Sequence, residues 1–545
     1  MTTGDLRNRL LAFLYGDDAA GSVGRQVEEL VASHRTERDP GQEPWSQRDA
    51  WLITYADQFK EPGRTPLASL GDFFDRHLSP WLNGLHLLPF YPWSSDDGFS
   101  VVDYLAVDPA NGSWEDIEAI AGRNRLGVDA VLNHMSSQSE WFRSFLTGDP
   151  SYDGYFRTRT KGGDYSAVVR PRSLPLFTEF EARPGTAEVW TTFSADQVDL
   201  DFSNPRVLLE SIDILLTYAS RGASFIRLDA IGFLWKEEGT SCIHLPGTHA
   251  VIQLWRACLQ DTYPDVLLLT ETNVPHEENI SYFGDGDVPE AHMVYQFALA
   301  PLVLDAYATG DAAVLRDWAG GLEALVPGTT FFNFLASHDG IGLRPLEGIS
   351  PPGAVTRLVD LTNEAGGQVS ERTGSEGVDV PYELNSTWFD LMAAGYDEET
   401  AVLRHVGSHA IQLALAGIPG IYVHSLLGTS NDQELFAKTG RPRSLNRHKF
   451  SDLARVEAAI MGRDATGRVF SRMRNMLQRR ADDSAFHPDS EQRILDLPTG
   501  LFGVQRIPSG GEPTTVVVNL TDREQAVRID NTTVHLDGFE TRWGG

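Results

Sequence analysis

The chain has 545 residues, 41% of them hydrophobic and 10% aromatic, which is enough for one large domain with smaller ones attached and argues against wholesale disorder. Lysine and arginine number 45 against 76 acidic residues, and the net charge of −31 argues against nucleic acid and membrane surfaces as partners. No apolar run reaches about 18 residues, and the N-terminus lacks the basic start and cleavage site of a signal peptide, so we expect a cytoplasmic protein.

Residues 1–50 show a helical pattern, with Leu6, Leu10, Leu11 and Leu14 on one face, and we expect an N-terminal extension packed on the main domain. From residue 51, apolar strand-like runs alternate with helical stretches. The eight runs lie at 51–56, 84–90, 127–134, 224–230, 265–272, 293–297, 330–338 and 417–425. Continuous apolar runs alternating with helices are typical of parallel strands covered on both faces, and eight of them predict an α/β fold, a (β/α)8 TIM barrel.

Two segments interrupt this alternation. Residues 135–203 and 340–400 are predicted to be loop domains inserted after the third and seventh strands, because long segments without regular pattern are usually functional or separate modules. The barrel then comprises 51–134, 204–339 and 401–480. A polar loop is expected after the eighth strand, then a long helical stretch, and the short alternating runs of 481–545 predict a C-terminal antiparallel β domain.

The run SFIRLDA, residues 224–230, carries Arg227 and Asp229 on one face of an otherwise apolar strand. Such charges are costly to bury, and they indicate either a structural ion pair or an active site. Glu271 and Asp339 follow other strand-like runs, and barrel sites form where strands end. Paired carboxylates suit glycosyl transfer, in which one attacks the anomeric carbon and the other protonates the leaving oxygen. We expect Arg227 to keep Asp229 ionised and desolvation to raise the pKa of Glu271; the alternative is a buried salt-bridge network.

Four segments, DAVLNH (129–134), FIRLDA (225–230), LLTET (268–272) and FLASHD (334–339), resemble in order the signature regions of the α-amylase superfamily. Within it the chain is most similar to the sucrose phosphorylase group, to judge from a further set of segments. These are ITYAD (53–57), SSDDGFSVVDY (94–104), RPR (170–172), DQVDLDF (196–202), KEEGTSC (236–242), NST (385–387) and RSLNRH (443–448).

The resemblance implies that Asp229 is the nucleophile, Glu271 the acid/base and Asp339 the transition-state stabiliser of a retaining glycoside phosphorylase. It also implies a subsite for the transferred glucose, formed by Asp96, His134, Phe193, Arg227, His338 and Arg443. Arg172 and Tyr382 match phosphate-contacting residues. Plain alternatives are core packing for Phe193 and His134, and a surface or domain-packing role for Arg172.

Three residues, Phe233, Glu383 and Arg344, together with the N-terminal extension, make the chain more similar to the glucosylglycerate phosphorylase branch. Arg344 could pair with a glycerate carboxylate; its alternative is a loop salt bridge. We therefore expect phosphorolysis of glucosylglycerate to α-glucose 1-phosphate, so a sugar and inorganic phosphate are the expected partners. Sucrose, sucrose 6-phosphate and glucosylglycerol stay open as substrates, as do a hydrolase, a transglucosidase and a non-catalytic binding protein.

The resemblance implies no cofactor and no metal, although amylases of this superfamily often hold calcium near the asparagine matching Asn133. It leaves a monomer or a homodimer open. Cys242 and Cys258 could form one disulfide, but nothing demands it. Gly366, Gly367, Gly374 and Gly377 suggest that the segment 340–400 moves between half-reactions.

Overall fold

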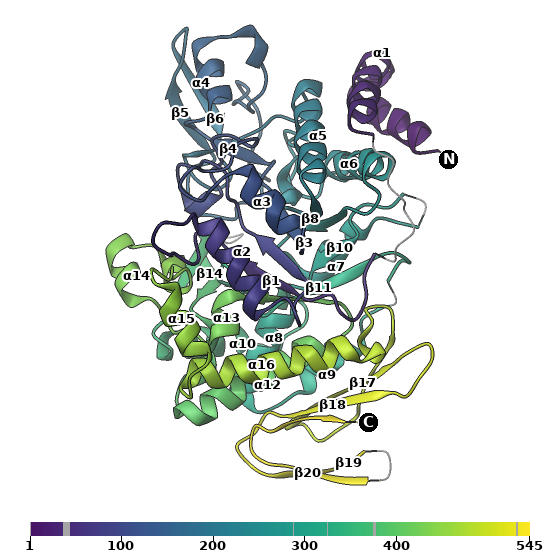
Figure 1. Ribbon diagram of the computed structural model, residues 1–545. Helices are drawn as coiled ribbons and strands as arrows, with labels where there is room; N and C mark the ends of the chain where they lie inside the picture. The colour runs from purple at the N-terminus through teal and green to yellow at the C-terminus, as the bar shows by residue number, and fades with distance from the viewer. Residues whose placement is uncertain are drawn as a thin grey trace.

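A computed structural model describes residues 2–35, 44–286, 288–323, 325–373, 378–529 and 532–544. Its centre is a closed barrel of eight parallel strands, which confirms the predicted (β/α)8 fold (Figure 1). The strands are β1 (Trp51–Thr54), β2 (Gly84–Leu87), β3 (Arg125–Ala130), β8 (Ala223–Leu228), β9 (Leu267–Thr270), β10 (Met293–Tyr295), β11 (Thr330–Asn333) and β15 (Ile418–Tyr422). They follow one another around the barrel in chain order, and β1 closes it by pairing with β15.

Helices surround the barrel because the strands are apolar on both faces and must be covered. They are α2 (Pro66–His77), α3 (Trp114–Ala121), α5 (Pro205–Ser220), α6 (Pro246–Thr262), α7 (His276–Ile280), α8 (Leu299–Thr309), α9 (Ala313–Gly320), α12 (Glu398–Ala414), α15 (Leu453–Ile460) and α16 (Ala465–Asp482). Local signals set their starts: Asn204 caps α5 by accepting from the backbone of Arg206, and proline occupies the first turn. The buried faces of these helices and the strands form one continuous core.

The N-terminal residues form α1 (Thr3–His34), which packs against α5 and α6 beside the barrel (Figure 1). Arg7 joins it to the barrel, because its guanidinium lies 2.5 Å from Asp261 of α6; a second contact of 2.6 Å, to Glu28, lies within α1 itself. The helical path is interrupted at Gly16, whose φ of 77° needs a residue without a Cβ. Part of the predicted extension 1–50, residues 36–43, lies outside the described residues.

Two small units stand over the carboxyl ends of the strands. After β3 come β4 (His134–Ser136), α4 (Glu140–Thr147), β5 (Phe177–Glu181), β6 (Thr186–Trp190) and β7 (Gln197–Asp199), with β4 paired to β7 and β5 to β6. After β11 come β12 (Ile341–Gly342), α10 (Ala354–Glu364), β13 (Gln368–Thr373), β14 (Asp379–Asn385) and α11 (Trp388–Ala393), with a sheet of order β12-β14-β13. The predicted bounds of the two inserted domains, 135–203 and 340–400, stay predictions. Gly374 and Gly377, which suggested movement of the second insert, lie outside the described residues.

The segment after β15 is not the polar loop that the sequence suggested. It contains α13 (Val423–Leu427), α14 (Gln433–Thr439) and a 3-10 turn (Pro442–Asn446). Asp432 caps α14 by accepting from the backbone of Leu435, and Gly440 ends it at φ 65°. The polar composition of α14, which has a capping Asp432 and no buried residue, favoured a loop, whereas the buried α13 begins inside the run 417–425 that was predicted as a strand.

The C-terminal strands form antiparallel sheets, as predicted, at the end of the molecule opposite the first insert (Figure 1). The larger sheet contains β16 (Glu491–Ile494), β17 (Leu501–Ile507), β18 (Thr514–Asn519) and β21 (Thr541–Gly544), and the smaller β19 (Gln525–Ile529) and β20 (Thr532–Leu536). Cys242 and Cys258 are buried and unpaired. Among the described residues, no helix is both long and apolar enough to cross a membrane.

Candidate active site

Three acidic residues from different strand ends border a single cavity at the carboxyl end of the barrel. Asp229 directly follows β8, Glu271 directly follows β9, and Asp339 lies in the loop after β11. The same cavity is lined by eight more of the residues predicted from the sequence. These are Asp96, His134, Arg172, Phe193, His338, Tyr382, Glu383 and Arg443. We call this cavity the inner chamber.

Arg227 lies beneath the inner chamber and is 2% exposed. Its Nη1 donates to Asp229 at 2.9 Å and to the buried Asp129 at 3.0 Å, while its Nη2 lies 3.9 Å from Glu271. Burial opposes the charge, but the three carboxylates raise the pKa of the guanidinium well above its usual value. The strand was predicted to carry either a structural ion pair or an active site. The structure combines the two, because the buried ion pair lies directly beneath the cavity.

The carboxyls of Asp229 and Glu271 are both hard to ionise. Burial raises the pKa of Asp229 to about 7, and Arg227 only partly opposes the shift. Burial likewise raises the pKa of Glu271 to about 7, against Arg227 and a hydrogen bond of 2.9 Å from the backbone of Ala230. The expected rise for Glu271 is present. Arg227 lowers the pKa of Asp229, in the expected direction, but desolvation outweighs the ion pair and the pKa is raised overall.

Asp339 behaves differently from the other two carboxyls. Burial alone would raise its pKa, but the nearby arginines, led by Arg443, outweigh burial and lower it. Arg443 Nη1 lies 2.5 Å from Asp339, and its other donors bind both oxygens of the buried Glu383 at 2.7 and 3.1 Å. The fork of Arg443 thus joins Glu383 of β14 to the acid after β11.

Two histidines form further walls of the inner chamber. Burial lowers the pKa of both, so each imidazole is neutral near pH 7. His134 Nε2 lies 3.0 Å from the carbonyl of Phe99 and 3.2 Å from Gln197, and His338 stacks on the Phe99 ring at 4.5 Å. Phe99 and Gln197 were not picked out from the sequence, although both lie in the segments SSDDGFSVVDY and DQVDLDF.

Asp96 has a positive φ of 52° at the mouth of the inner chamber. Arg447 lies 3.5 Å from Asp96 and 2.6 Å from Asp97. Arg447 was also missed in the sequence, although it stands in RSLNRH beside Arg443. Its contacts reach across about 350 residues, and no local pattern predicts them.

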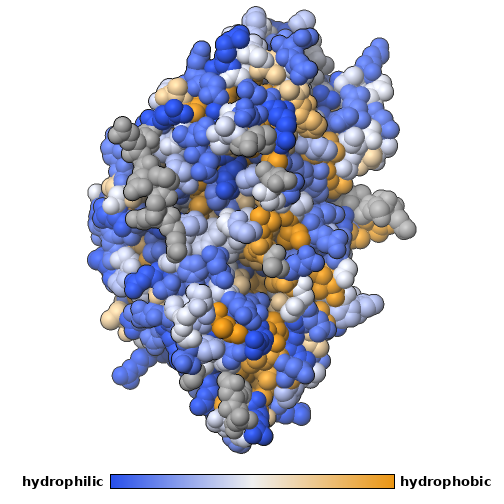
Figure 2. Space-filling model, turned by 90° about the vertical axis from the view of Figure 1, so that its right-hand side faces the viewer, coloured by the Kyte–Doolittle hydropathy of each residue, from blue (hydrophilic) through white to orange (hydrophobic). Residues whose placement is uncertain are grey.

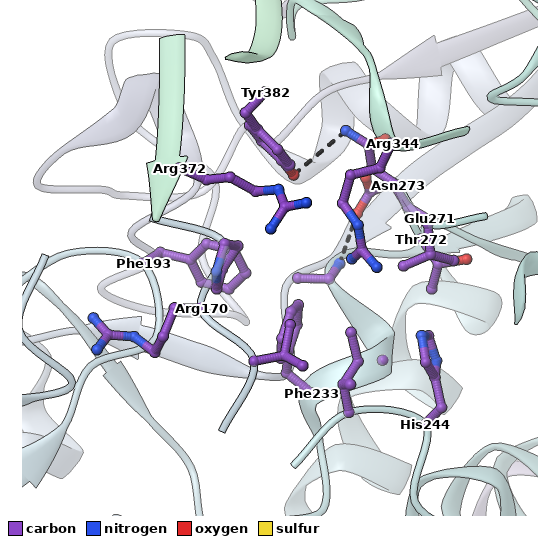
Figure 3. A pocket seen from close by; sticks show the side chains of 16 residues that line it. Arg170, Phe193, Phe233, His244, Glu271, Thr272, Asn273, Arg344, Arg372 and Tyr382 are labelled. Carbon is purple, nitrogen blue, oxygen red and sulfur yellow. Dashed lines mark hydrogen bonds between the residues drawn. The ribbon is translucent and has the colours of Figure 1, made fainter. Parts of the chain in front are cut away.

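A second cavity, which we call the outer chamber, adjoins the inner one. Phe193, Glu271 and Tyr382 line both. Arg344 borders the outer chamber and not the inner one, together with Arg372, Phe233 and His244 (Figure 3). Tyr382 accepts a long hydrogen bond of 3.4 Å from Asn273, and the guanidinium carbon of Arg172 lies 5.7 Å from its ring centre. Glu271 thus stands between a chamber rich in acids and one rich in arginines.

Comparison with known proteins shows which family the chain resembles over most of its length. The family described as "Alpha amylase, catalytic domain" matches residues 81–339. A glucosylglycerate phosphorylase of Spirochaeta thermophila is 46% identical over 96% of this chain and 90% of its own, and one of Escherichia coli is 41% identical over 95% and 92%. A sucrose phosphorylase of Agrobacterium vitis is 32% identical over 74% and 82%.

The chain belongs to the sucrose phosphorylase group of the α-amylase superfamily. The structure of a sucrose 6F-phosphate phosphorylase from Thermoanaerobacter thermosaccharolyticum shares the fold, with a TM-score of 0.77 over 91% of this chain and 99% of its own at 24% identity. The α/β barrel seen here is therefore that of an enzyme family whose members are named phosphorylases.

A buried lysine lies beside Asn133. The buried Lys236 places its Nζ 3.1 Å from Asn133 Oδ1 and 3.0 Å from Asp199 Oδ2, and it donates to the carbonyl of Phe233 at 2.8 Å. The ammonium thus joins the loop after β8 to β7 and to the end of β3. The segment KEEGTSC was noted in the sequence, but the role of its first residue was not predicted.

Proposed function

We propose that this protein is a retaining glycoside phosphorylase that converts glucosylglycerate and inorganic phosphate to α-D-glucose 1-phosphate and glycerate, reversibly. The observation that carries the proposal is the set Asp229, Glu271 and Asp339 at the wall of one cavity. The relatives at 41–46% identity over nearly the whole chain, which are named glucosylglycerate phosphorylases, support the substrate.

In the first half-reaction, an oxygen of Asp229 attacks the anomeric carbon of the bound glucosyl group. The bond to the leaving oxygen breaks, and Glu271 gives its proton to that oxygen. Arg227 contacts Asp229 directly at 2.9 Å but Glu271 only at 3.9 Å. Since both pKa values are raised to about 7 by burial, this difference favours the proton on Glu271 and the negative charge on Asp229.

In the second half-reaction, a phosphate oxygen attacks the glucosyl carbon from the side that the acceptor has left. Glu271, now a carboxylate, takes the proton of that oxygen, and the bond to Asp229 breaks. Asp339 stabilises the positive charge that develops on the sugar ring in both steps, because its lowered pKa keeps it ionised. Arg172 and Tyr382 are the proposed phosphate contacts.

The neutral histidines His134 and His338, with Asp96 and Arg443, are the proposed contacts of the glucosyl hydroxyls, and Phe193 is the aromatic wall beside them. Glu383 acts on the sugar through Arg443, whose fork it holds. Arg344 in the outer chamber is the proposed contact of the glycerate carboxylate. The contacts of Arg344 with Glu278 and Glu347 are both 3.9 Å, so its loop salt bridges are weak.

The test is an acceptor screen in the synthetic direction. The protein is incubated with α-glucose 1-phosphate and with D-glycerate, glycerol, fructose or fructose 6-phosphate singly, and phosphate release is compared with a reaction without acceptor. We expect strong release with glycerate alone. Release with another acceptor would change the substrate and keep the mechanism, whereas equal release without any acceptor would indicate a hydrolase.

The Asp229→Asn variant tests the covalent step. It should lose turnover by at least about 10³-fold, because the amide is not a nucleophile and removal of such a group costs several orders of magnitude in kcat. Trapping a glucosyl group on residue 229 of the wild type with a slow fluorinated donor, by mass spectrometry of peptides, would support the intermediate. Unchanged turnover in Asp229→Asn would contradict the mechanism.

A further inference from the structure

The two chambers on either side of Glu271 differ in charge. The inner chamber is lined by the acids Asp96, Asp229, Glu271, Asp339 and Glu383 against two arginines. Among the described residues that line the outer chamber, Glu271 is the only acid, against Arg170, Arg344 and Arg372. The two cavities are similar in volume, about 60 Å³ for the outer and about 70 Å³ for the inner, so the charge of the lining distinguishes them. The positive lining of the outer chamber suits an anion.

Two of the arginines aim into this space. In Figure 3 the guanidinium groups of Arg344 and Arg372 point toward each other across the chamber, whereas that of Arg170 points away. Arg344 comes from the turn after β12, and Arg372 from β13 in the same insert. The Nε atoms of both are buried without a hydrogen-bond partner.

Among the described residues, Glu347 faces both arginines, and Glu278 lies 3.9 Å from Arg344, but neither acid provides a hydrogen bond to the two buried Nε atoms. Arg372 Nη2 donates to Glu347 Oε1 at 3.2 Å, and Arg344 Nε lies 3.9 Å from the same oxygen. The Glu347 side chain is 50% exposed, so it holds the pair from the solvent side. A planar fork with unused buried donors is suited to an oxyanion, because an unsatisfied buried donor costs free energy that a bound anion recovers.

The other walls do not compete for an anion. Phe233 is apolar, and burial lowers the pKa of His244 to about 4, so its imidazole adds no positive charge near pH 7. Its Nδ1 lies 2.6 Å from the hydroxyl of Tyr282. Positive charge in the outer chamber is thus concentrated on the arginines.

We propose that Arg372 is a specificity-determining residue, which acts with Arg344 as a two-arginine clamp for the small oxyanion on the leaving-group side of Glu271. The clamp rests on the proposed function, in which that oxyanion is the acceptor carboxylate in one half-reaction and inorganic phosphate in the other. Both oxyanions present two coplanar oxygens to such a fork.

The experiment uses α-D-glucosyl fluoride as a donor without phosphate, so that the acceptor is the only oxyanion supplied. Transfer to D-glycerate, to phosphate and to neutral glycerol is measured for the wild type, Arg372→Met, Arg372→Lys and Arg344→Met. In Arg372→Met the ratio of kcat/KM for glycerate to that for glycerol should fall about 10- to 100-fold, the loss expected for charge-assisted hydrogen bonds. Arg372→Lys should recover part of it. Arg455→Met, at a side chain 89% exposed on α15, is the matched control and should keep the ratio.

The acceptors separate the possible ligands. A loss confined to glycerate assigns the clamp to the carboxylate, and a loss confined to phosphate assigns it to phosphate. Ratios within twofold of the wild type for both anions would overturn the clamp. If the wild type transfers to neither anion, the proposed function falls. The clamp is then judged by inhibition of fluoride hydrolysis: inhibition by either anion that Arg372→Met weakens supports it, and equal or absent inhibition overturns it.

Discussion

At the scale of single residues, the floor of the inner chamber keeps carboxyl groups where water cannot solvate them. Asp229 and Asp129 share the Nη1 of Arg227, so one buried cation faces more negative charge than it neutralises. Such an arrangement favours proton transfer but lowers the stability of the folded state, because burying each ionised carboxylate costs desolvation free energy. The elevated pKa values of Asp229 and Glu271 express this cost and have a consequence for stability.

We predict that the Tm of Asp229→Asn rises relative to that of the wild type as the pH is raised from 5 to 8. The folded pKa of Asp229 is raised from 3.8 to about 7. The folded state therefore binds a proton more tightly than the unfolded state, and that stability is lost as pH rises from about 4 through about 7. Asparagine does not titrate. The difference in Tm between variant and wild type should grow by roughly 1–3 °C from pH 5 to pH 8 in scanning calorimetry.

The exposed Asp522 offers the control for this experiment, with a side chain 72% exposed. Asp522→Asn should give no such growth with pH. A Tm difference for Asp229→Asn that is constant between pH 5 and pH 8 would show that burial does not raise the pKa of this carboxyl.

At the scale of elements, the loop after β8 depends on Lys236. Its ammonium joins Asp199 of β7, Asn133 after β3 and the carbonyl of Phe233 in the outer chamber. We predict that Lys236→Met lowers the free energy of unfolding by about 3 kcal/mol, because the buried Asp199 loses its counter-charge and keeps only its hydrogen bonds from Asn133 and Thr192. Denaturant unfolding measures this loss, and kcat should fall with it as Phe233 and His134 lose their common support.

A second variant separates charge from packing. Asp199→Asn added to Lys236→Met should restore part of the stability, whereas Lys161→Met at an exposed site should change little. If the double variant is as unstable as the sum of both single variants, the two groups do not act as a pair.

Arg7 joins α1 to α6 of the barrel through Asp261, beside the apolar side chains that α1 buries. We predict that Arg7→Met destabilises the protein by about 1–3 kcal/mol, since its charge-assisted bonds to Asp261 and Glu28 are lost. KM values should not change, because no described residue of α1 lines either chamber. Arg9→Met, an exposed neighbour, is the control. A raised KM in Arg7→Met at full stability would instead connect α1 to the site.

The sequence predicted the elements that depend on short-range pattern. All eight barrel strands were found, because buried parallel strands are continuous apolar runs, and acids at their ends converge once the barrel is known. It did not predict α13 and α14, or the roles of Lys236, Arg372 and Arg447. Lys236, Arg372 and Arg447 contact residues of other elements that are distant in sequence. A charged residue with a distant partner has the same local sequence pattern as one that faces solvent, so these contacts could not be predicted.

At the scale of the whole molecule, acid residues dominate, and the site must still admit anions. The face in Figure 2 is hydrophilic over most of its area, in keeping with a net charge of −31. A negative field of this kind opposes the approach of glycerate or phosphate, and the arginines that line the outer chamber beside Glu271 counter it locally. The rate at which an anionic acceptor reaches the site should therefore depend on the salt concentration, whereas the rate of glucosyl transfer within the site should not.

We predict that kcat/KM for an anionic acceptor rises when NaCl is increased from 10 to 150 mM, whereas that for glycerol stays level. The Debye length falls from about 30 to about 8 Å over this range. Repulsion by distant surface charge is then screened, but contacts of about 3 Å inside the partly buried outer chamber are screened far less. Initial rates with glucosyl fluoride at both salt concentrations measure the effect. A fall with glycerate alone would mean that attraction by the arginines, and not repulsion by the surface, governs how anions reach Glu271.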